Sequence, residues 1–474
     1  MKVLLLDAVD IKSCYINIGF ATIAAVLKQE NHKVKYLSLA WDSDKLTKES
    51  IAKLDVDAVG VSTMTSQYYN LQGVLKTLKE ALDIPILLGG VHPTIDPDDV
   101  LRNPHVDAIC LGEGEGAMVD FCSRVEKGKR FDDVPNIWTK KKKNPIRPLL
   151  TSDELNDLPF PDRKLFKVER NQKVSNRVNI MAGRGCPYNC TYCINHILQS
   201  IYKVPIKDYT RIRSPERVLE ELREIKRDFK PGAVVFNDDT LCYFKDWLEK
   251  FLPGYKREIG IPFSLTGRVG LLDDKLLGLL RDANCSSIWV GVESGNPGIR
   301  EKILRRFYSN EQVIETFNLI KKYGLNSKSF NMLGIPEESG EEIMDTIRLN
   351  QSIGADQRYI KILTPYPKSQ VFGYAKHHNL LRGDPKDIKE LEDYRPGILD
   401  TGRLNRYEIL AWRHMWDWYM AINKIKRIRG LFFFNYYKAV SRLSLLGPEN
   451  PLQEMLTEIG AKITDLSKKD VQAE

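Results

Sequence analysis

The chain has 474 residues, of which 71 are basic and 63 acidic, giving a formal net charge of +8, and 42% are hydrophobic. These proportions are ordinary for a folded globular protein, and so small a charge excess does not by itself indicate a nucleic-acid partner. No apolar run approaches the ~20 residues of a membrane-spanning helix, and the N-terminus lacks the apolar stretch of a signal peptide. We therefore expect a cytoplasmic protein of about three domains.

The first 130 residues alternate between strand and helix patterns. Strands are predicted at residues 3–6, 33–39, 58–62, 84–88 and 108–111, and helices at 18–30, 44–53 and 69–82. This alternation is typical of a parallel, doubly wound α/β sheet of the Rossmann or flavodoxin kind, which binds ligands at the carboxyl ends of its strands. The turn after the first strand holds Asp7 and Asp10 but no Gly-x-Gly-x-x-Gly, so the sequence disfavours a dinucleotide site.

Small and polar residues follow the third, fourth and fifth of these strands. They are Ser62, Thr63, Gly89, Gly90, His92, Thr94, Gly112, Glu113 and Gly114. Glycines permit close backbone approach, and hydroxyl groups donate and accept hydrogen bonds. Each patch alone also suits an ordinary turn, but three at consecutive strand ends predict one ligand surface.

The Gly-Gly-x-His-x-Thr and Gly-Glu-Gly-Glu stretches carry a resemblance over most of residues 1–125. They resemble the cobalamin-binding domain that precedes many radical S-adenosylmethionine (SAM) domains. The resemblance implies cobalamin contacts at the nine residues above. The Asp-x-His-x-x-Gly loop of other cobalamin proteins is missing, so no lower ligand of the cobalt is assigned. His92 is expected near the corrin edge, and a turn or capping role is the alternative.

The middle of the chain resumes the strand–helix alternation after a proline-containing segment. We predict a cobalamin-binding domain at residues 1–150, a linker at 151–176, a partial barrel at 177–379 and a helical region at 380–474. The barrel strands are expected at 178–182, 233–237, 263–267, 287–291, 327–333 and 358–363. Six strand–helix units favour an open six-stranded barrel over a closed eight-stranded one. A helix at 215–229 is expected to begin after Ser214, with Pro215 in its first position.

Three cysteines, Cys186, Cys190 and Cys193, lie on the loop after the first barrel strand in a C-x3-C-x2-C spacing. Three thiolates on one short loop can hold three irons of a four-iron cluster and leave the fourth iron open. His196 follows three residues later, so a Cys3His zinc site is one alternative, and three reduced structural cysteines are another. The carboxyl end of a strand is where such a barrel places its chemistry, which favours the cluster.

The other five cysteines are scattered along the chain and are expected to be small buried side chains that stay reduced. They are Cys14, Cys110, Cys122, Cys242 and Cys285. No second cluster is expected.

With Tyr192 directly before its third cysteine, the loop resembles the signature of the radical SAM superfamily. The resemblance implies a 4Fe-4S cluster whose open iron binds the amino and carboxylate groups of SAM, with Tyr192 beside the adenine. It also places SAM contacts at the strand ends. The expected contacts are Asp238, Arg268, Glu293 and Asn331. Carboxylates suit the ammonium and hydroxyl groups of SAM and an arginine suits its carboxylate, while salt bridges on loops are the alternative for the three charged residues.

Two turns depart from the usual form of that family. Glu337 follows Pro336, and Lys368 follows Pro367, at positions where glycine is common. These residues are expected to alter the turn geometry or the substrate side of the pocket.

The last 95 residues, 380–474, show no strand alternation. A helix is expected at 404–429, carrying Trp412, Trp416 and Trp418, and basic and aromatic residues follow it. A membrane-surface helix, and with it a lipid-like substrate, is one alternative. A helical cap that packs its aromatic side chains onto the barrel mouth is favoured.

The combined resemblance implies a cobalamin-dependent radical SAM methyltransferase. The reduced cluster would split SAM into methionine and a deoxyadenosyl radical, which removes hydrogen from an unactivated carbon or phosphorus centre. The substrate radical would then take a methyl group from methylcobalamin, and a second SAM would remethylate the cobalt. The expected partners are an external one-electron donor and a small molecule, such as a lipid-like compound or a natural-product intermediate, with no nucleic acid.

Three other functions stay open at this point. A ring-forming or ring-rearranging enzyme would use both cofactors without methyl transfer. A cobalamin- or metal-binding regulator would not cleave SAM. Methylthiotransferases resemble the chain poorly, because they need a second cysteine-rich domain. Substrate-side catalytic residues are not assigned.

Overall fold

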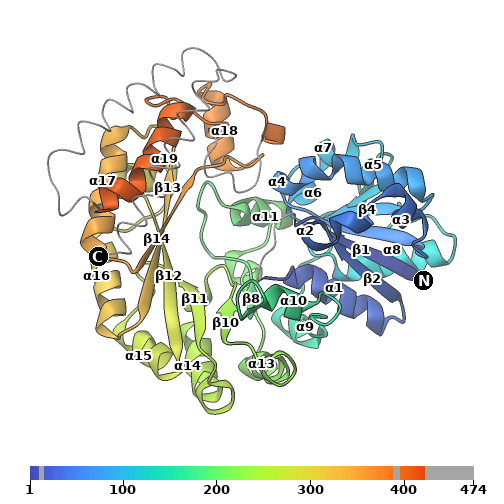
Figure 1. Ribbon diagram of the computed structural model, residues 1–474, viewed down its shortest axis with the longest axis horizontal. Helices are drawn as coiled ribbons and strands as arrows, with labels where there is room; N and C mark the ends of the chain where they lie inside the picture. The colour runs from blue at the N-terminus through green and yellow to red at the C-terminus, as the bar shows by residue number, and fades with distance from the viewer. Residues whose placement is uncertain (10–14, 388–395, 422–474) are drawn as a thin grey trace. The chain divides into compact units, whose positions relative to one another are not determined.

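The computed structural model describes residues 1–9, 15–387 and 396–421. The chain forms two compact units, and Figure 1 traces their elements. Unit 1 consists of Met1–Tyr188, Ile194–Thr266 and Gly278–Ser286. Unit 2 consists of Asn189–Cys193, Gly267–Leu277 and Ser287–Glu474. The domain bounds given above stay a prediction.

The N-terminal sheet confirms the predicted doubly wound fold. Its six strands are β1 (Lys2–Asp7), β2 (Lys33–Ser38), β3 (Ala58–Ser62), β4 (Ile86–Gly89), β5 (Ala108–Cys110) and β6 (Ile137–Thr139). They lie in the order β2-β1-β3-β4-β5-β6, and the first five run parallel. The short strand β6 is antiparallel to β5 and was not predicted, because three residues carry no readable periodicity. The ends of β3, β4 and β5, which carry the predicted rim, are therefore neighbours.

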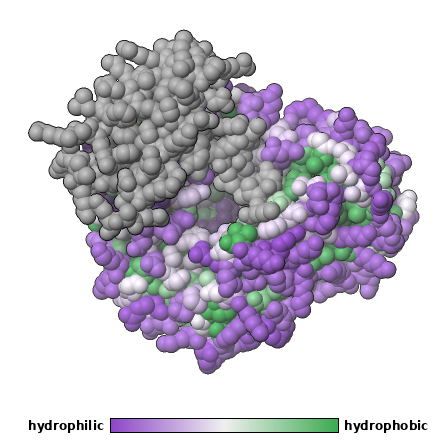
Figure 2. Space-filling model, viewed as in Figure 1, coloured by the Kyte–Doolittle hydropathy of each residue, from purple (hydrophilic) through white to green (hydrophobic). Residues whose placement is uncertain are grey.

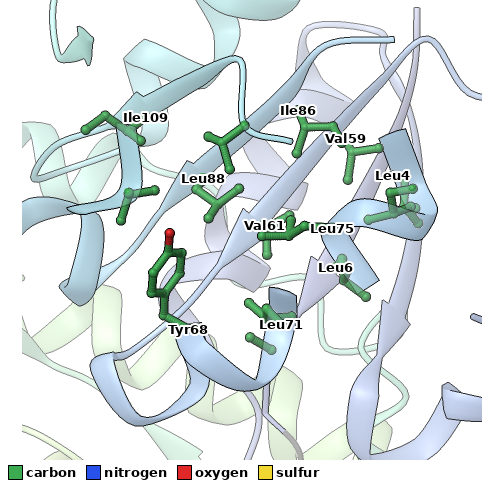
Figure 3. Close-up of a cluster of buried hydrophobic side chains, with 14 of the residues drawn as sticks. Leu4, Leu6, Val59, Val61, Tyr68, Leu71, Leu75, Ile86, Leu88 and Ile109 are labelled. Atoms are coloured by element: carbon green, nitrogen blue, oxygen red, sulfur yellow. The ribbon is translucent and has the colours of Figure 1, made fainter. Parts of the chain in front are cut away.

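Helices cover both faces of this sheet. The longer ones are α1 (Ile18–Gln29), α5 (Gln72–Ala81) and α8 (Glu115–Glu126). The strand residues Leu4, Leu6 and Val61 pack with Leu71 and Leu75 in one core cluster (Figure 3). Leu5 points the other way, as alternate strand residues do. Shorter helices of this part are α2 (Leu39–Asp42), α3 (Lys48–Ala52), α4 (Thr65–Tyr68), α6 (Val91–Ile95) and α7 (Pro97–Leu101).

The predicted linker contains two short helices, α9 (Ser152–Asp157) and α10 (Val168–Gln172). The hydroxyl of Thr151 accepts a hydrogen bond from the backbone N–H of Glu154, and the Glu154 side chain accepts one from the N–H of Thr151. This capping box stabilises the start of α9. Pro159 and Pro161 follow in a segment without regular secondary structure.

The second six-stranded sheet confirms the open barrel. Its strands are β7 (Arg177–Ile180), β10 (Ala233–Phe236), β11 (Phe263–Gly267), β12 (Cys285–Glu293), β13 (Asn326–Leu333) and β14 (Gln357–Ile362). Their order is β14-β13-β12-β11-β10-β7, so β7 and β14 are edges. The strands β7, β10 and β11 pair in parallel, as do β12, β13 and β14.

Helices follow the barrel strands as the alternation predicts. They are α11 (Ile194–Tyr202), α12 (Ile206–Tyr209), α13 (Pro215–Phe229), α14 (Lys245–Gly254), α15 (Asp274–Asp282), α16 (Asn310–Lys322), α17 (Gly340–Ile353) and α18 (Gln370–His377). The predicted cap of α13 is confirmed, because the Ser214 hydroxyl accepts a hydrogen bond from the N–H of Arg217 and Pro215 begins the helix. A two-residue pair, β8 (Gly183–Arg184) with β9 (Arg211–Ile212), was not predicted.

The C-terminal helix α19 (Arg406–Ala421) packs against α17 and β14. Trp416 is 1% exposed and lies in a core cluster with Ile409 and Leu333. This packing sets Trp416 against residues of β13 and α17, and a cap over the barrel mouth stays a prediction. The remainder of the predicted helix, with its basic and aromatic followers, lies outside the described residues.

None of the described helices is long and apolar enough to cross a membrane. Figure 2 shows mainly hydrophilic residues on the described part of the face that it presents, with small hydrophobic patches between them.

The two turns that lack the family's glycine adopt the backbone that glycine favours. Glu337 has a φ of 69° and Lys368 a φ of 62°, both in the left-handed region. Such a conformation strains a residue with a side chain. The surrounding structure holds both turns, and the N–H of Glu337 donates to the carbonyl of Thr401.

Candidate active site

The predicted rim residues in unit 1 form one hydrogen-bonded set. The N–H of Thr63 donates to the carbonyl of Gly89, and the hydroxyl of Thr94 donates to the carbonyl of Gly90. The N–H of Gly112 donates to the hydroxyl of Thr94. These bonds tie the ends of β3, β4 and β5 together, so the structure brings the three predicted patches side by side.

Gly90 is required by the close approach of two strand ends. Its φ is +96°, and a Cβ at this position would lie 2.7 Å from the carbonyl oxygen of Thr63. Any side chain here would push the two loops apart. Gly90 therefore lets the ends of β3 and β4 lie close together.

His92 is fully buried below the rim. Its Nε2 lies 3.3 Å from Oδ2 of Asp99, and its Nδ1 lies 3.3 Å from the hydroxyl of Thr65. The ring packs against Tyr68 and Tyr69, with centroids 4.5 and 5.6 Å away. These contacts connect His92 of α6 with Asp99 of α7 and Thr65 of α4, and its place near the corrin edge stays a prediction.

Glu113 joins the rim to the segment that leads into the cysteine loop. Its Oε1 accepts hydrogen bonds from Arg184 at 3.0 Å and from Arg211 at 2.9 Å. Arg184 also donates to Oε1 of the buried Glu115 at 2.6 Å. The hydroxyl of Tyr202, from α11, accepts from the N–H of Glu113 at 2.9 Å. The carboxylate of Glu113 is thus paired with two arginines of the protein.

The electrostatics of Glu113 follow from this arrangement. Burial alone would raise the pKa of Glu113, but the guanidinium groups of Arg184 and Arg211 outweigh it and hold that pKa below its ordinary value. Glu113 is therefore an anion at neutral pH. Buried charges of this kind persist only when they are paired and hydrogen-bonded.

The first cysteine of the loop, Cys186, is 9% exposed in unit 1. Its Sγ lies 3.1 Å from the hydroxyl of Thr240, and its carbonyl accepts from the side chain of Gln199 at 2.8 Å. The residue before it, Gly185, has a φ of +88°, and a Cβ there would lie 2.2 Å from the carbonyl oxygen of Tyr209. This glycine lets the chain turn sharply into the loop.

Asp238 is placed behind this turn. Its two carboxylate oxygens accept hydrogen bonds from the N–H groups of Ala182 and Gly183, at 3.0 and 2.6 Å. Burial raises the pKa of Asp238 to about 7, against the lowering effect of those two bonds. The side chain shapes the backbone before Cys186, and a direct SAM contact by Asp238 stays a prediction.

The other two cysteines, Cys190 and Cys193, belong to unit 2. Nη1 of Arg268 lies 3.9 Å from Sγ of Cys190. The intervening Thr191 is anchored by its hydroxyl to the carbonyl of Ile303 at 2.6 Å and by its N–H to that of Leu304. A cation beside a cysteine sulfur fits an anionic iron–sulfur cluster, whose sulfurs accept such contacts.

Tyr192 and Glu293 meet in a buried network of unit 2. The hydroxyl of Tyr192 donates to Oε1 of Glu293 at 3.1 Å, and Nη1 of Arg306 donates to both, at 2.8 and 2.9 Å. Glu293 has a φ of 65° and follows a β-bulge at the end of β12. Strained backbone of this kind at a strand end is typical of functional sites. Nε of Arg306 donates a hydrogen bond to the hydroxyl of Tyr308 at 3.0 Å.

Asn331 lies on the other face of its strand. Its amide donates to the Ser329 hydroxyl and to Asn350 of α17, and its Oδ1 accepts from the Asn350 amide at 2.7 Å. The same amide also donates to the carbonyl of Tyr359. Asn331 is the partner of Glu293 in the register of β12 and β13, but its side chain is bonded to Asn350 of α17.

The remaining described cysteines form no disulfide and lie in the protein interior, as predicted. Burial raises the pKa values of Cys110, Cys122 and Cys242 to about 12, so these thiols stay protonated. Cys14 lies outside the described residues. In the described part of the chain, no three His, Cys, Asp or Glu side chains converge as they would around a single metal ion. His196, the fourth ligand of the zinc alternative, is a buried residue of α11.

Sequence reasoning missed the arginines that hold these groups. Arg184 lies between two glycines just before Cys186. This position is the one feature of the sequence that could have marked Arg184 as a residue of the site. Arg211 lies 27 residues after Arg184, and Arg306 lies 13 residues after Glu293. No known motif has either spacing, so the sequence does not identify these arginines. Only the fold brings them to the site.

Comparison with known protein families gives two matches. The Radical SAM superfamily model matches residues 180–349. The B12 binding domain model matches residues 5–121. The first match contains the cysteine loop and the strands from β8 to β13, and the second contains the whole rim.

Curated relatives extend over most of the chain. An uncharacterized methyltransferase of Pyrococcus horikoshii is 28% identical over 377 residues, covering 77% of this chain and 79% of that protein. An anaerobic magnesium-protoporphyrin IX monomethyl ester cyclase of Rubrivivax gelatinosus is 26% identical, covering 76% and 66%. A cytidylyl-2-hydroxyethylphosphonate methyltransferase of Streptomyces wedmorensis is 22% identical, covering 83% of each chain.

Two solved structures share the fold. The radical SAM methyltransferase TsrM of Kitasatospora setae matches with a TM-score of 0.66 at 15% identity, covering 81% of this chain and 79% of that one. The cobalamin-dependent SAM radical enzyme OxsB matches with a TM-score of 0.67 at 16% identity, covering 97% and 74%. At these identities the likeness concerns the fold alone.

Proposed function

We propose that this chain, which belongs to the cobalamin-binding radical SAM superfamily of enzymes, is a methyltransferase acting on an unactivated carbon or phosphorus centre of a small molecule. The superfamily's cofactors are a 4Fe-4S cluster, SAM and cobalamin. When bound, the cluster and SAM supply a radical that removes hydrogen, and cobalamin supplies a methyl carrier.

One observation carries the proposal. Within unit 1, the glycine-rich rim and the entry to the cysteine loop are held together by Glu113, Arg184, Arg211 and Glu115. A cobalamin on the rim and a cluster on the loop would then be held by one connected framework. In cofactor enzymes, the protein contributes mainly by holding the reacting groups in fixed positions.

The residues around the loop have separate tasks in this proposal. Cys186, Cys190 and Cys193 would hold the cluster, and Arg268 would balance its negative charge. Glu293 is fixed by Tyr192 and Arg306, so its carboxylate would meet the polar groups of SAM in one orientation. Pre-oriented groups lower the entropy cost of binding and keep the reacting bond in place.

Relatives named methyltransferases favour methyl transfer, while a relative named a cyclase keeps ring formation as a second candidate. The two functions consume SAM differently. Methyl transfer needs SAM both as a radical source and as a methyl donor, and ring formation needs it only as a radical source. The nucleoside products therefore separate the two candidates.

The test uses the full-length protein, reconstituted anaerobically with iron and sulfide, loaded with cobalamin and reduced with a one-electron donor. SAM is added, and 5′-deoxyadenosine and S-adenosylhomocysteine are measured by mass spectrometry. The proposal predicts both nucleosides, with S-adenosylhomocysteine lost when cobalamin is omitted. 5′-Deoxyadenosine alone would favour ring formation, and neither product would indicate a non-catalytic cobalamin-binding protein.

A further inference from the structure

Tyr202, the last residue of α11, places its hydroxyl group on the glycine-rich rim of unit 1. Oη of Tyr202 accepts a hydrogen bond from the N–H of Glu113 at 2.9 Å. Gly112 has a φ of +72°, and a Cβ at this position would lie 1.8 Å from the same oxygen. The tyrosine hydroxyl therefore takes the space that a side chain at position 112 would occupy, just after the end of β5.

The helix that carries Tyr202 is itself tied to the cysteine loop. Gln199 lies three residues before Tyr202, so both side chains leave the same side of α11. Nε2 of Gln199 donates a hydrogen bond to the carbonyl of Cys186 at 2.8 Å. The helix also packs against α6 of the rim. One turn of α11 thus connects the first cysteine of the loop with the end of β5, and the surrounding structure fixes the position of Tyr202.

The hydroxyl of Tyr202 can donate a hydrogen bond as well as accept one. Its acceptor role is taken by the N–H of Glu113, but its O–H donates to no group in the described part of the chain. Burial raises the pKa of Tyr202 to about 12, so this group keeps its hydrogen at neutral pH. A half-buried donor is therefore held at the rim in one place, ready for an acceptor that the chain itself does not supply.

The chemistry of cobalamin matches this donor. The edge of its corrin ring carries carboxamide side chains, whose carbonyl oxygens accept hydrogen bonds. A doubly wound sheet binds its ligand at the carboxyl ends of its strands, which is where the Tyr202 hydroxyl lies. The B12 binding domain match includes Gly112 and Glu113, whereas Tyr202 belongs to the Radical SAM match. No contact between Tyr202 and cobalamin follows from the B12 binding domain alone.

We propose that Tyr202 is a cobalamin-binding residue whose hydroxyl donates a hydrogen bond to a carboxamide oxygen of the corrin. The contact would come from the radical SAM domain, whereas the contacts predicted from the sequence all lie in the B12 binding domain. Because Gln199 ties the same helix to Cys186, α11 would hold the corrin edge and the start of the cysteine loop on one rigid element. The inference goes beyond methyl transfer, since ring formation would use the same contact.

Affinity for cobalamin tests the energy of this hydrogen bond. Tyr202→Phe keeps the ring and removes the hydroxyl, so aquacobalamin should bind about fivefold more weakly to the full-length protein, as expected for the loss of one hydrogen bond. Tyr255→Phe is the matched control, because it removes a hydroxyl that donates to the carbonyl of Ile261 inside unit 1. The control should bind cobalamin as the unmodified protein does. Equilibrium dialysis measures all three affinities.

A second measurement separates contact with cobalamin from an effect on the rim, because Tyr202→Phe also removes the acceptor of the Glu113 N–H. 3-Fluorotyrosine is incorporated at position 202, or at position 255 as the control, and is followed by fluorine NMR. Aquacobalamin, which contains diamagnetic cobalt(III), should shift the signal at position 202. Reduction of the bound cobalamin by one electron from ascorbate, which gives paramagnetic cobalt(II), should broaden that signal and leave the signal at position 255 sharp. This measurement keeps the hydroxyl, so it decides the question even if Tyr202→Phe does not fold.

Weaker binding by Tyr202→Phe, together with a shifted and broadened signal at position 202, would support the inference. Unchanged cobalamin affinity would overturn it, and so would a signal at position 202 that responds no more than the one at position 255. The release of S-adenosylhomocysteine is measured on the same preparation. If it forms while Tyr202→Phe binds cobalamin normally, only the role of Tyr202 is wrong. If cobalamin binds through Tyr202 while no S-adenosylhomocysteine forms, the methyl-transfer proposal fails and the role of Tyr202 stands.

Discussion

Nη1 of Arg184 donates a hydrogen bond to Oε1 of Glu113 over 3.0 Å, and Arg184 lies two residues before Cys186. Glu113 belongs to the glycine-rich rim at the end of β5, and Cys186 begins the loop after β8. A change at one site can therefore move the backbone of the other through this part-buried ion pair. The rigidity of this link underlies the proposed placement of the two cofactors.

Arg184→Met should lower the free energy of unfolding by about 2–3 kcal/mol, because it leaves Glu113 and Glu115 without their shared cation. The estimate lies at or below the lower end for buried pairs, since the Arg184 side chain is 25% exposed. Urea unfolding followed by circular dichroism measures the change. Arg130→Met, which breaks the exposed pair with Asp132, is the control and should change stability by less than about 1 kcal/mol. Equal stability of the Arg184 variant and the unmodified protein would show that the ion pairs do not hold this region.

Glu293→Gln should weaken SAM binding about tenfold or more while iron content stays unchanged. Glutamine keeps the hydrogen bonds with Tyr192 and Arg306 but loses the negative charge that would meet the ammonium of SAM. Tyr192→Phe removes one hydrogen bond and should cost about fivefold at most. Equilibrium dialysis with labelled SAM gives both affinities. Unchanged SAM affinity in the glutamine variant would assign Glu293 to the internal network with Arg306 alone.

Asn331→Ala should destabilise the protein by about 1–3 kcal/mol and leave SAM affinity close to that of the unmodified protein. The substitution removes the partner of Asn350 inside the packing of α17 on β13. Thermal unfolding and SAM dialysis on the same sample separate the two effects. A loss of SAM affinity with no change in melting temperature would instead restore Asn331 to the cofactor site.

A pH dependence of stability is expected from Glu338, which is fully buried after β13. Burial raises the pKa of Glu338 to about 8, although the N–H groups of Gly334 and Ile335 lower it. Between about pH 4.5 and 8, the folded chain keeps a proton that the unfolded chain releases, so stability falls as pH rises through this window. The effect is absent below the unfolded pKa and complete above the folded one.

Glu338→Gln should flatten this fall, because its amide oxygen can accept both hydrogen bonds and its NH₂ replaces the protonated oxygen. Melting temperatures at pH 5.5 and 8.0 measure the slope, and Glu341→Gln, at an exposed glutamate of α17, is the control. A variant as pH-sensitive as the unmodified protein would show that Glu338 is ionised in the folded chain.

Much of the fold was predictable because both sheets are built from long, repeated strand–helix units. The strands of both sheets were located to within two residues at most ends, except β6. The elements that escaped prediction are short. The pair β8–β9 has two residues in each strand, and the first helix of the predicted linker, α9, depends on a local capping box. Neither is long enough to show the hydrophobic periodicity of a strand or a helix.

The candidate site was predictable only where the chemistry lies within one short motif. The cysteine spacing and the glycine rim are local patterns, and the structure assembles the rim residues as expected. The direction of a single side chain is harder to predict, because it depends on strand register. Asn331 points to α17 since it shares a face with Ser329, while Lys328 and Phe330 face the other way. Partners such as Arg306 are distant in sequence and emerge only with the fold.

The most direct test of the account is the metal content of the purified protein and its cysteine variants after anaerobic reconstitution with iron, sulfide and cobalamin. Three thiolates that hold a four-iron cluster predict about four irons and about one cobalt per chain. Replacing Cys186, Cys190 and Cys193 with alanine should remove the iron and leave the cobalt, while Cys285→Ala, at a buried thiol, should retain both. Zinc in place of iron, or iron that survives loss of the three cysteines, would contradict the account.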